Sequence, residues 1–167
     1  MSSSQAPSSP TITATEFGLE TLAATREFGR RLAALLVAGD IVRLEGDLGA
    51  GKSELARSVI HALAGAEIEV PSPTFTLAQH YPLPGLPVMH ADLYRIGSAE
   101  EIFELGIMEA LDDGCLLVEW PENAEDLLPL TGLRIRLLHA SGMSREARVE
   151  ALDSGWVGRM KDLVAGD

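Results

Sequence analysis

The spacing of hydrophobic residues alternates along the chain between a helical and a strand-like pattern. Between residues 19 and 38, apolar side chains recur at intervals close to one helical turn. They are Leu22, Phe28, Leu32, Leu35 and Leu36. This spacing predicts a helix from Leu19 to Ala38, with Gly39 in the place of a C-terminal cap.

A short apolar run, IVRLEG at residues 41–46, predicts a strand that leads into a glycine-rich stretch. The next segment, KSELARSVIHAL at residues 52–63, places Leu55, Val59, Ile60 and Leu63 on one helical face. A strand, a glycine-rich loop and a helix in this order are what a phosphate-binding loop requires.

The second half of the chain continues the alternation. We expect a strand around VMHADLY (88–94), an acidic helix from Ser98 to about Leu111, and a buried strand at CLLVEW (115–120). The segments RIRLLHA (134–140) and REARVEAL (145–152) predict an antiparallel strand pair, followed by a short helix near Trp156 to Val164. The pattern contains no internal repeat and predicts an α/β fold.

The length and composition allow one substantial core. The chain has 167 residues, of which 46% are hydrophobic, and little material is left for a second core. We therefore expect one domain over residues 11–167. Residues 1–10, MSSSQAPSSP, are rich in serine and proline and are predicted to form a disordered tail.

The charge balance disfavours direct binding to nucleic acid. There are 13 basic and 25 acidic residues, a net charge of -12, and the basic residues form no concentrated patch. Aromatic residues make up only 5%, too few to suggest a surface on which bases stack. A basic protein partner is electrostatically easier to accommodate.

Three further features predict a cytoplasmic protein. The N-terminal stretch lacks the basic start and apolar run of a secretory signal. No apolar run reaches the roughly 18 residues needed to span a bilayer. Cys115 is the single cysteine, which fits a reducing compartment.

The stretch GDLGAGKSE, residues 46–54, carries the strongest chemical signal in the chain. Gly46, Gly51, Lys52 and Ser53 complete the pattern G-x-x-x-x-G-K-[ST]. Glycines let backbone N–H groups turn toward phosphate oxygens, and the following helix adds its positive N-terminal end. Lys52 is expected to reach the outer phosphates, and Ser53 is expected to be a ligand of Mg²⁺. The nucleotide contacts predicted in this stretch are Gly46, Asp47, Leu48, Gly49, Ala50, Gly51, Lys52, Ser53 and Glu54.

A plain glycine turn between strand and helix is the alternative explanation of this stretch. The flanking strand and helix favour nucleotide binding instead. No N-K-x-D segment that would read guanine is present, so ATP is favoured over GTP.

Two carboxylates are candidates for the chemistry. Glu119 ends the apolar run LLVE, where a phosphate-binding-loop protein needs an acid near its magnesium; a solvent-facing strand end is the alternative. Asp92 shares one side of its strand with His90 and Tyr94 and could orient the attacking water or hold a metal-bound one. Its alternative role is an ion pair with Arg95.

The segment SPTFT, residues 72–76, allows two interpretations. Thr74 and Thr76 next to stiffening prolines suit either a loop that senses the terminal phosphate or a rigid entrance to a strand. His90 is expected to be a hydrogen-bonded structural histidine. The other histidines show no metal-ligand spacing with Cys115, so no zinc site is expected.

The motifs GDLGAGKS, SPTFTL, HADLYR, LLVEWPE and REARV occur together in one order. This order and spacing resemble those of the TsaE (YjeE) family, small bacterial ATPases required for threonylcarbamoyladenosine formation on tRNA. The resemblance covers residues 19–152. It implies a P-loop NTPase fold, with a mostly parallel central sheet flanked by helices and an antiparallel C-terminal strand pair.

The resemblance also implies roles for individual residues. Ser53 and Glu119 match the magnesium ligands, and Asp92 matches a further functional acid that can lie near the metal. Residues 72–76 match a switch-like segment, while Thr25 and Arg145 match nucleotide-contacting positions. Ser53 stands where many members have threonine, and both residues offer a hydroxyl group.

The implied function is a Mg²⁺-dependent ATP hydrolase, slow alone, that supports N6-threonylcarbamoyladenosine formation at position 37 of tRNA. The implied partners are the proteins TsaD and TsaB. Two alternatives stay open. One is a small-molecule kinase with a lid formed by Arg134, Arg136, Arg145 and Arg148. The other is a nucleotide-gated binding module in which hydrolysis is incidental.

Overall fold

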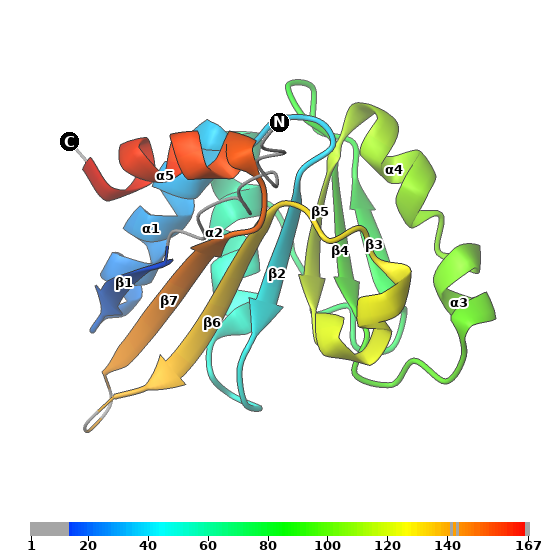
Figure 1. Cartoon of the computed structure of the whole chain (residues 1–167), viewed down its shortest axis with the longest axis horizontal. Helices are drawn as coiled ribbons and strands as arrows, with labels where there is room; N and C mark the ends of the chain where they lie inside the picture. The colour runs from blue at the N-terminus through cyan, green and yellow to red at the C-terminus, as the bar shows by residue number, and fades with distance from the viewer. Residues whose placement is uncertain (1–13, 141, 143, 166–167) are drawn as a thin grey trace, which may run out of the picture.

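The computed structural model describes residues 14–140, 142 and 144–165. The predicted tail, residues 1–10, lies outside this range. Within the described residues, seven strands form one sheet in the order β1-β7-β6-β2-β5-β4-β3 (Figure 1). Their bounds are β1 Ala14–Leu19, β2 Ile41–Glu45, β3 Ala78–Tyr81, β4 Val88–Asp92, β5 Cys115–Glu119, β6 Leu133–His139 and β7 Arg145–Ala151.

The centre of the sheet is parallel and its margins are antiparallel. Strand β2 pairs in parallel with β5 and β6, and β5 pairs in parallel with β4. Strands β7 and β1 extend one side and β3 the other, all by antiparallel pairing. The predicted fold, a mostly parallel sheet with an antiparallel C-terminal pair, is therefore confirmed.

Helices cover both faces of the sheet, on opposite halves (Figure 1). Their bounds are α1 Leu22–Leu35, α2 Lys52–Ala64, α3 Ala99–Glu104, α4 Ile107–Asp113, the 3-10 helix η1 Pro121–Leu127 and α5 Ser154–Ala165. Helices α1, α2 and α5 share one apolar core with strands β2, β6 and β7. Helices α3, α4 and η1 share a second core with the other face of β4 and β5.

Strand β5 shows why a continuous apolar run marks the middle of such a sheet. Cys115 and Leu117 point into the first core, while Leu116 and Val118 point into the second. Both faces of a central strand are covered, so every position between the two ends must be apolar. The buried strand predicted from this run is confirmed.

The first helix is shorter than the spacing predicts. It starts after Thr21, whose hydroxyl oxygen accepts a hydrogen bond from the N–H of Ala24 at 3.1 Å, and it ends at Leu35. Gly39 is not its cap: it adopts φ 92° in the turn that follows, and its N–H donates to Gly114 at 2.9 Å. Residues 14–19, directly before the helix, form the edge strand β1, which the apolar spacing does not predict.

The predicted acidic helix from Ser98 to Leu111 is two helices. Helix α3 is capped by the Ser98 hydroxyl, which accepts from the N–H of Glu101 at 3.4 Å. The chain then breaks at Gly106, which has φ 75° and starts α4. A left-handed residue cannot continue an α-helix, so the periodicity is interrupted there. Within the described residues, no helix is both long and apolar enough to cross a membrane.

Candidate functional site

The candidate site is a cavity of about 730 Å³ at the carboxyl ends of β2, β4 and β5. Eleven of the residues that the sequence nominates line it: Thr25, Leu48, Gly49, Gly51, Lys52, Ser53, Glu54, Thr74, Asp92, Glu119 and Arg145. Ligands of open α/β sheets bind at this edge, because loops and helix N-termini converge there. The fold thus brings distant sequence motifs into one pocket.

Three nominated loop residues do not line this cavity. Gly46 and Asp47 border a second cavity of about 670 Å³, on the β6 side of the loop. Ala50 is buried in the core beneath the loop.

The loop between β2 and α2 has a backbone that glycine alone fits easily. Gly51 adopts φ 103°, and an added Cβ would lie 2.5 Å from the guanidinium nitrogen of Arg145. Gly46 adopts φ 144°, and an added Cβ would lie 2.7 Å from the carbonyl oxygen of Leu137. The positive φ angle explains glycine at both positions, and at Gly46 the backbone oxygen of Leu137 also leaves no room for a Cβ; at Gly51 the near atom is the end of a flexible side chain that can move.

Lys52 starts α2, and its ammonium group points into the loop. The side chain is only 5% exposed. Its Nζ donates to the carbonyl oxygens of Gly46 at 2.5 Å and of Asp47 at 2.9 Å. Burial lowers the pKa of Lys52, while four surrounding carboxylates, Glu119 foremost among them, act to raise it.

Trp120 covers the lysine and was not nominated by the sequence. The Nζ atom lies 4.2 Å from the centroid of the Trp120 ring, which also contacts the ring of Tyr94 at 4.8 Å. Trp120 has φ 56°, a left-handed conformation that is uncommon for a large side chain. Non-glycine residues in this region concentrate at functional sites. Its position directly after Glu119, at the end of a predicted central strand, is the signal in the sequence that could have identified Trp120 as a site residue.

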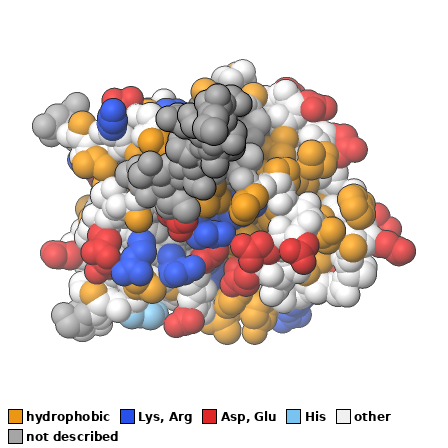
Figure 2. Space-filling model, in the orientation of Figure 1, with side chains coloured by type: hydrophobic (Ala, Val, Ile, Leu, Met, Phe, Trp, Pro, Cys, Tyr) orange, Lys and Arg blue, Asp and Glu red, His pale blue; other side chains and the backbone are white. Residues whose placement is uncertain are grey.

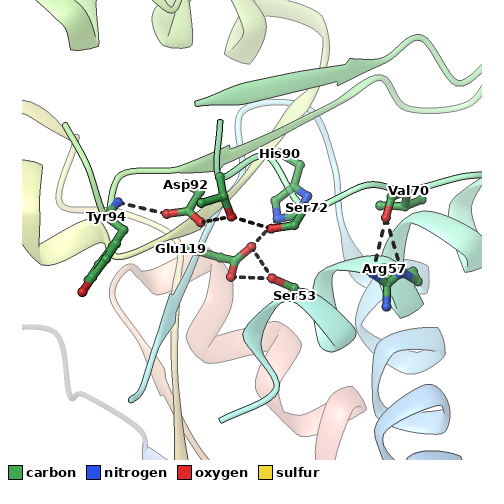
Figure 3. Close-up of polar contacts among 9 residues, drawn as sticks. Ser53, Arg57, Val70, Ser72, His90, Asp92, Tyr94 and Glu119 are labelled. Carbon is green, nitrogen blue, oxygen red and sulfur yellow. Dashed lines mark hydrogen bonds and ion pairs between the residues drawn. The ribbon is translucent and has the colours of Figure 1, made fainter. Parts of the chain in front are cut away.

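Ser53 and Glu119 face one another across the cavity floor (Figure 3). The Ser53 hydroxyl lies 2.9 Å from Oε1 and 3.1 Å from Oε2 of Glu119. Glu119 is 3% exposed, so the alternative of a solvent-facing strand end is wrong. Its carboxylate also accepts from Nε2 of His90 at 2.7 Å. The prediction of a hydrogen-bonded histidine is confirmed, but its partner is a site residue.

Asp92 lies beside Glu119, because the two residues are register partners at the ends of β4 and β5. One Asp92 oxygen accepts from the N–H of Tyr94 at 2.9 Å, and the other accepts from the Thr74 hydroxyl at 3.4 Å. Arg95 instead lies over the ring of Phe75, at 5.5 Å. Within the described part of the chain, no ion pair joins Arg95 to Asp92.

The two threonines of the 72–76 segment face different ways. Thr74 lines the cavity and bonds to Ser72 at 2.8 Å as well as to Asp92. Thr76 accepts from the side-chain amide of Gln79 at 3.1 Å, at the entrance to β3. Thr76 thus lies at the entrance to a strand, whereas Thr74 lies in the cavity, where a role in sensing the terminal phosphate stays a prediction.

Thr25 and Arg145 reach the cavity through the edge strand that the sequence pattern missed. Leu19, the last residue of β1, is the register partner of Arg145 at the start of β7. This pairing brings the start of α1, and with it Thr25, next to Arg145. The Arg145 guanidinium donates to the carbonyl oxygen of Gly49 at 3.3 Å.

The arginines considered for a kinase lid do not form one. Arg136 lies 3.0 Å from Glu45, Arg148 lies 3.0 Å from Glu16, and Arg134 lies 3.1 Å from Glu125. These three belong to β6 and β7, outside the cavity lining. Figure 2 shows basic side chains gathered near the middle of one face, with acidic side chains on both sides.

Comparison with known proteins agrees with this arrangement. The sequence model of the family described as "Threonylcarbamoyl adenosine biosynthesis protein TsaE" matches residues 19–147. A Streptomyces coelicolor protein named "tRNA threonylcarbamoyladenosine biosynthesis protein TsaE" is 39% identical over 148 residues, covering 84% of this chain and 99% of its own. A Rickettsia bellii protein of the same name is 42% identical over 113 residues, covering 68% of this chain and 78% of its own.

A solved structure shares the fold. The "Crystal structure of Bacillus subtilus YdiB" superposes with a TM-score of 0.78 and 27% sequence identity, over 94% of this chain and 98% of that one. The resemblance predicted from the motifs is thus confirmed, and the chain belongs to the TsaE family.

Proposed function

We propose that this protein binds MgATP in the cavity and hydrolyses it to ADP and phosphate in support of threonylcarbamoyladenosine formation on tRNA. One observation carries the proposal. The hydroxyl group of Ser53, in the phosphate-binding motif, lies 2.9 Å from the buried carboxylate of Glu119. A hydroxyl and a carboxylate converging at the start of the loop helix are the oxygen ligands that Mg²⁺ prefers.

The residues present fit a magnesium–nucleotide complex. Ser53 and Glu119 would hold the cation, with Asp92 beside them. The bound cation would neutralise charge on the outer phosphate oxygens. The positive φ angles of Gly46, Gly49 and Gly51 are of the kind that lets a loop turn its backbone N–H groups toward a phosphate, which supports the proposal.

The positions of the remaining residues and the family resemblance support the following roles. Lys52 exchanges its loop carbonyls for phosphate oxygens, and the N-terminus of α2 adds its partial positive charge. Asp92 orients the attacking water, and Thr74, already bonded to Asp92, senses the terminal phosphate. Arg145 and Thr25, which line the same cavity, contact the nucleotide.

The proposed partners are the proteins TsaD and TsaB. Relatives named for tRNA threonylcarbamoyladenosine biosynthesis support the pathway. The net charge of -12 supports a role in which a partner holds the tRNA, because this chain would repel its phosphates. ATP turnover would then reset the partner complex.

Measuring phosphate release with and without TsaD and TsaB tests the proposal. We expect slow turnover alone and faster turnover with both partners. Unchanged turnover in the presence of both partners contradicts the partnership. Transfer of the phosphoryl group to a metabolite instead of water would favour the kinase alternative.

The binding-module alternative needs a separate experiment. An Asp92→Asn variant that still binds ATP is tested for tRNA modification in cells lacking the native gene. If modification is lost, hydrolysis is required; if it persists without turnover, nucleotide binding alone is sufficient.

A further inference from the structure

His90 does not line the cavity but lies directly behind Glu119, one of the residues that do. It lies two residues before Asp92 on β4, and its side chain is 1% exposed. Its Nε2 atom lies 2.7 Å from Oε2 of Glu119 (Figure 3). Glu119 is thus held by His90 on one side and by Ser53 on the other.

The environment of the imidazole ring determines where its proton lies. An ionised carboxylate only accepts hydrogen bonds, so Nε2 of His90 must carry the hydrogen. Nδ1 is buried and has no hydrogen-bond partner among the described residues. The hydrogen bond between the two side chains therefore runs from the Nε2–H group of His90 to Oε2 of Glu119.

A carboxylate that binds a cation must be held in one orientation. The hydrogen bond from His90 holds Oε2 of Glu119, while Oε1 faces the Ser53 hydroxyl at 2.9 Å. Outer partners of this kind change metal affinity by about 10- to 100-fold in other proteins.

We infer that His90 is a positioning residue that holds the Glu119 carboxylate toward Ser53 for a divalent cation. The cation belongs to the proposed function, whereas the contact between His90 and Glu119 does not depend on it. The experiment has two parts, which separate failure of this inference from failure of the proposed function.

The first part measures how much Mg²⁺ is needed for tight ADP binding, by calorimetry. His90→Leu removes the donor at similar volume, His90→Gln keeps an N–H of similar reach, and His80→Leu on the neighbouring strand β3 is the exposed control. We expect His90→Leu to need about tenfold more Mg²⁺. We expect His90→Gln and His80→Leu to stay within about threefold of the wild type, and ADP affinity in EDTA to be the same in all four proteins.

An unchanged Mg²⁺ requirement in folded His90→Leu overturns the inference alone. A loss shared equally by the leucine and glutamine variants also overturns it, because the N–H group would then not be the cause. Absence of ADP binding in the wild type instead refutes the proposed function and, with it, the cation-binding role.

The second part uses nitrogen-15 NMR of the histidine rings without nucleotide. The His90 signals are assigned from the His90→Gln spectrum. We expect the Nε2 signal to show a hydrogen on this atom and to shift clearly in Glu119→Ala. An Nε2 atom without hydrogen, or no response to Glu119→Ala, overturns the positioning role.

Discussion

Replacing Lys52 with alanine removes the ammonium group at the centre of the loop. In the wild type this group is buried and donates to the carbonyl oxygens of Gly46 and Asp47 at 2.5 and 2.9 Å. Phosphate binding therefore does not begin with a free ammonium: two existing hydrogen bonds are exchanged for stronger ones to phosphate. The binding free energy lost in Lys52→Ala is therefore the difference between the hydrogen bonds to phosphate and the hydrogen bonds to the two loop carbonyls.

The size of the effect follows from this exchange. A hydrogen bond to a charged group contributes about 1.5–3 kcal/mol net. Taking one such bond as the net gain on binding, Lys52→Ala should raise the Kd for MgATP by roughly 10- to 150-fold. Stability should change by only about 1 kcal/mol, because the lost hydrogen bonds are offset by relief of the burial that lowers the lysine pKa.

Titration calorimetry with ADP or a non-hydrolysable ATP analogue measures the Kd, and thermal denaturation shows whether the variant is folded. The only other lysine, Lys161, is exposed on α5 and provides a matched control. Lys161→Ala should bind as the wild type does. A folded Lys52→Ala protein whose Kd stays within about threefold of the wild type would refute the reasoning.

Three other changes have defined outcomes. Asp92→Asn should lower kcat for ATP hydrolysis by about 100-fold or more while changing the Kd for nucleotide less than about threefold; steady-state phosphate release and calorimetry check this, and undiminished turnover would refute it. Burial, followed by the charge of Asp40, raises the pKa of Cys115 to about 12, whereas the pKa of an unfolded thiol is about 8.5. As pH rises, the unfolded state therefore loses its proton first, and the free energy of unfolding should fall by about 1.4 kcal/mol per pH unit between about pH 9 and 12. Denaturation of the wild type and of Cys115→Ala across this range checks this. An equal pH dependence of the two proteins would refute it. Asp40→Ala should lower the free energy of unfolding, measured by urea denaturation, by about 3 kcal/mol, because Arg159 loses the carboxylate that it contacts at 2.7 and 2.9 Å. Asp162→Ala, at an exposed position, is the control, and equal stability of the two variants would contradict the expectation.

The central elements could be predicted because their signals are local. The run around residues 115–119 is apolar at both alternating sets of positions, which fits a strand covered on two faces. The loop at residues 46–53 and its helix follow from a fixed spacing of glycine, lysine and serine. The fold class and the phosphate-binding motif rest on these segments, whereas the family resemblance also needs the motifs SPTFTL, HADLYR and REARV.

The margins of the sheet could not be predicted in the same way. In β1, Leu19 is the only fully buried residue, and the strand exists because it pairs with β7 more than a hundred residues later. Strand β3 has no fully buried residue at all, and its one partner in the described sheet is β4. Because the side chains of an edge strand pack against fewer neighbours than those of a central strand, fewer of its positions need to be apolar, and its hydrophobic pattern is weak.

The sequence by itself determined the candidates for the chemistry: the glycine loop, its lysine and serine, and the acids that end two central strands. Tertiary structure alone decided which of these residues meet. The pairing of β4 with β5 sets Asp92 beside Glu119, and packing of the same strands turns His90 onto the Glu119 carboxylate. The physical reason is that backbone geometry and hydrophobic spacing are encoded over a few neighbouring residues. Contacts between side chains of different strands depend instead on strand order and register, which are fixed only when the whole core packs.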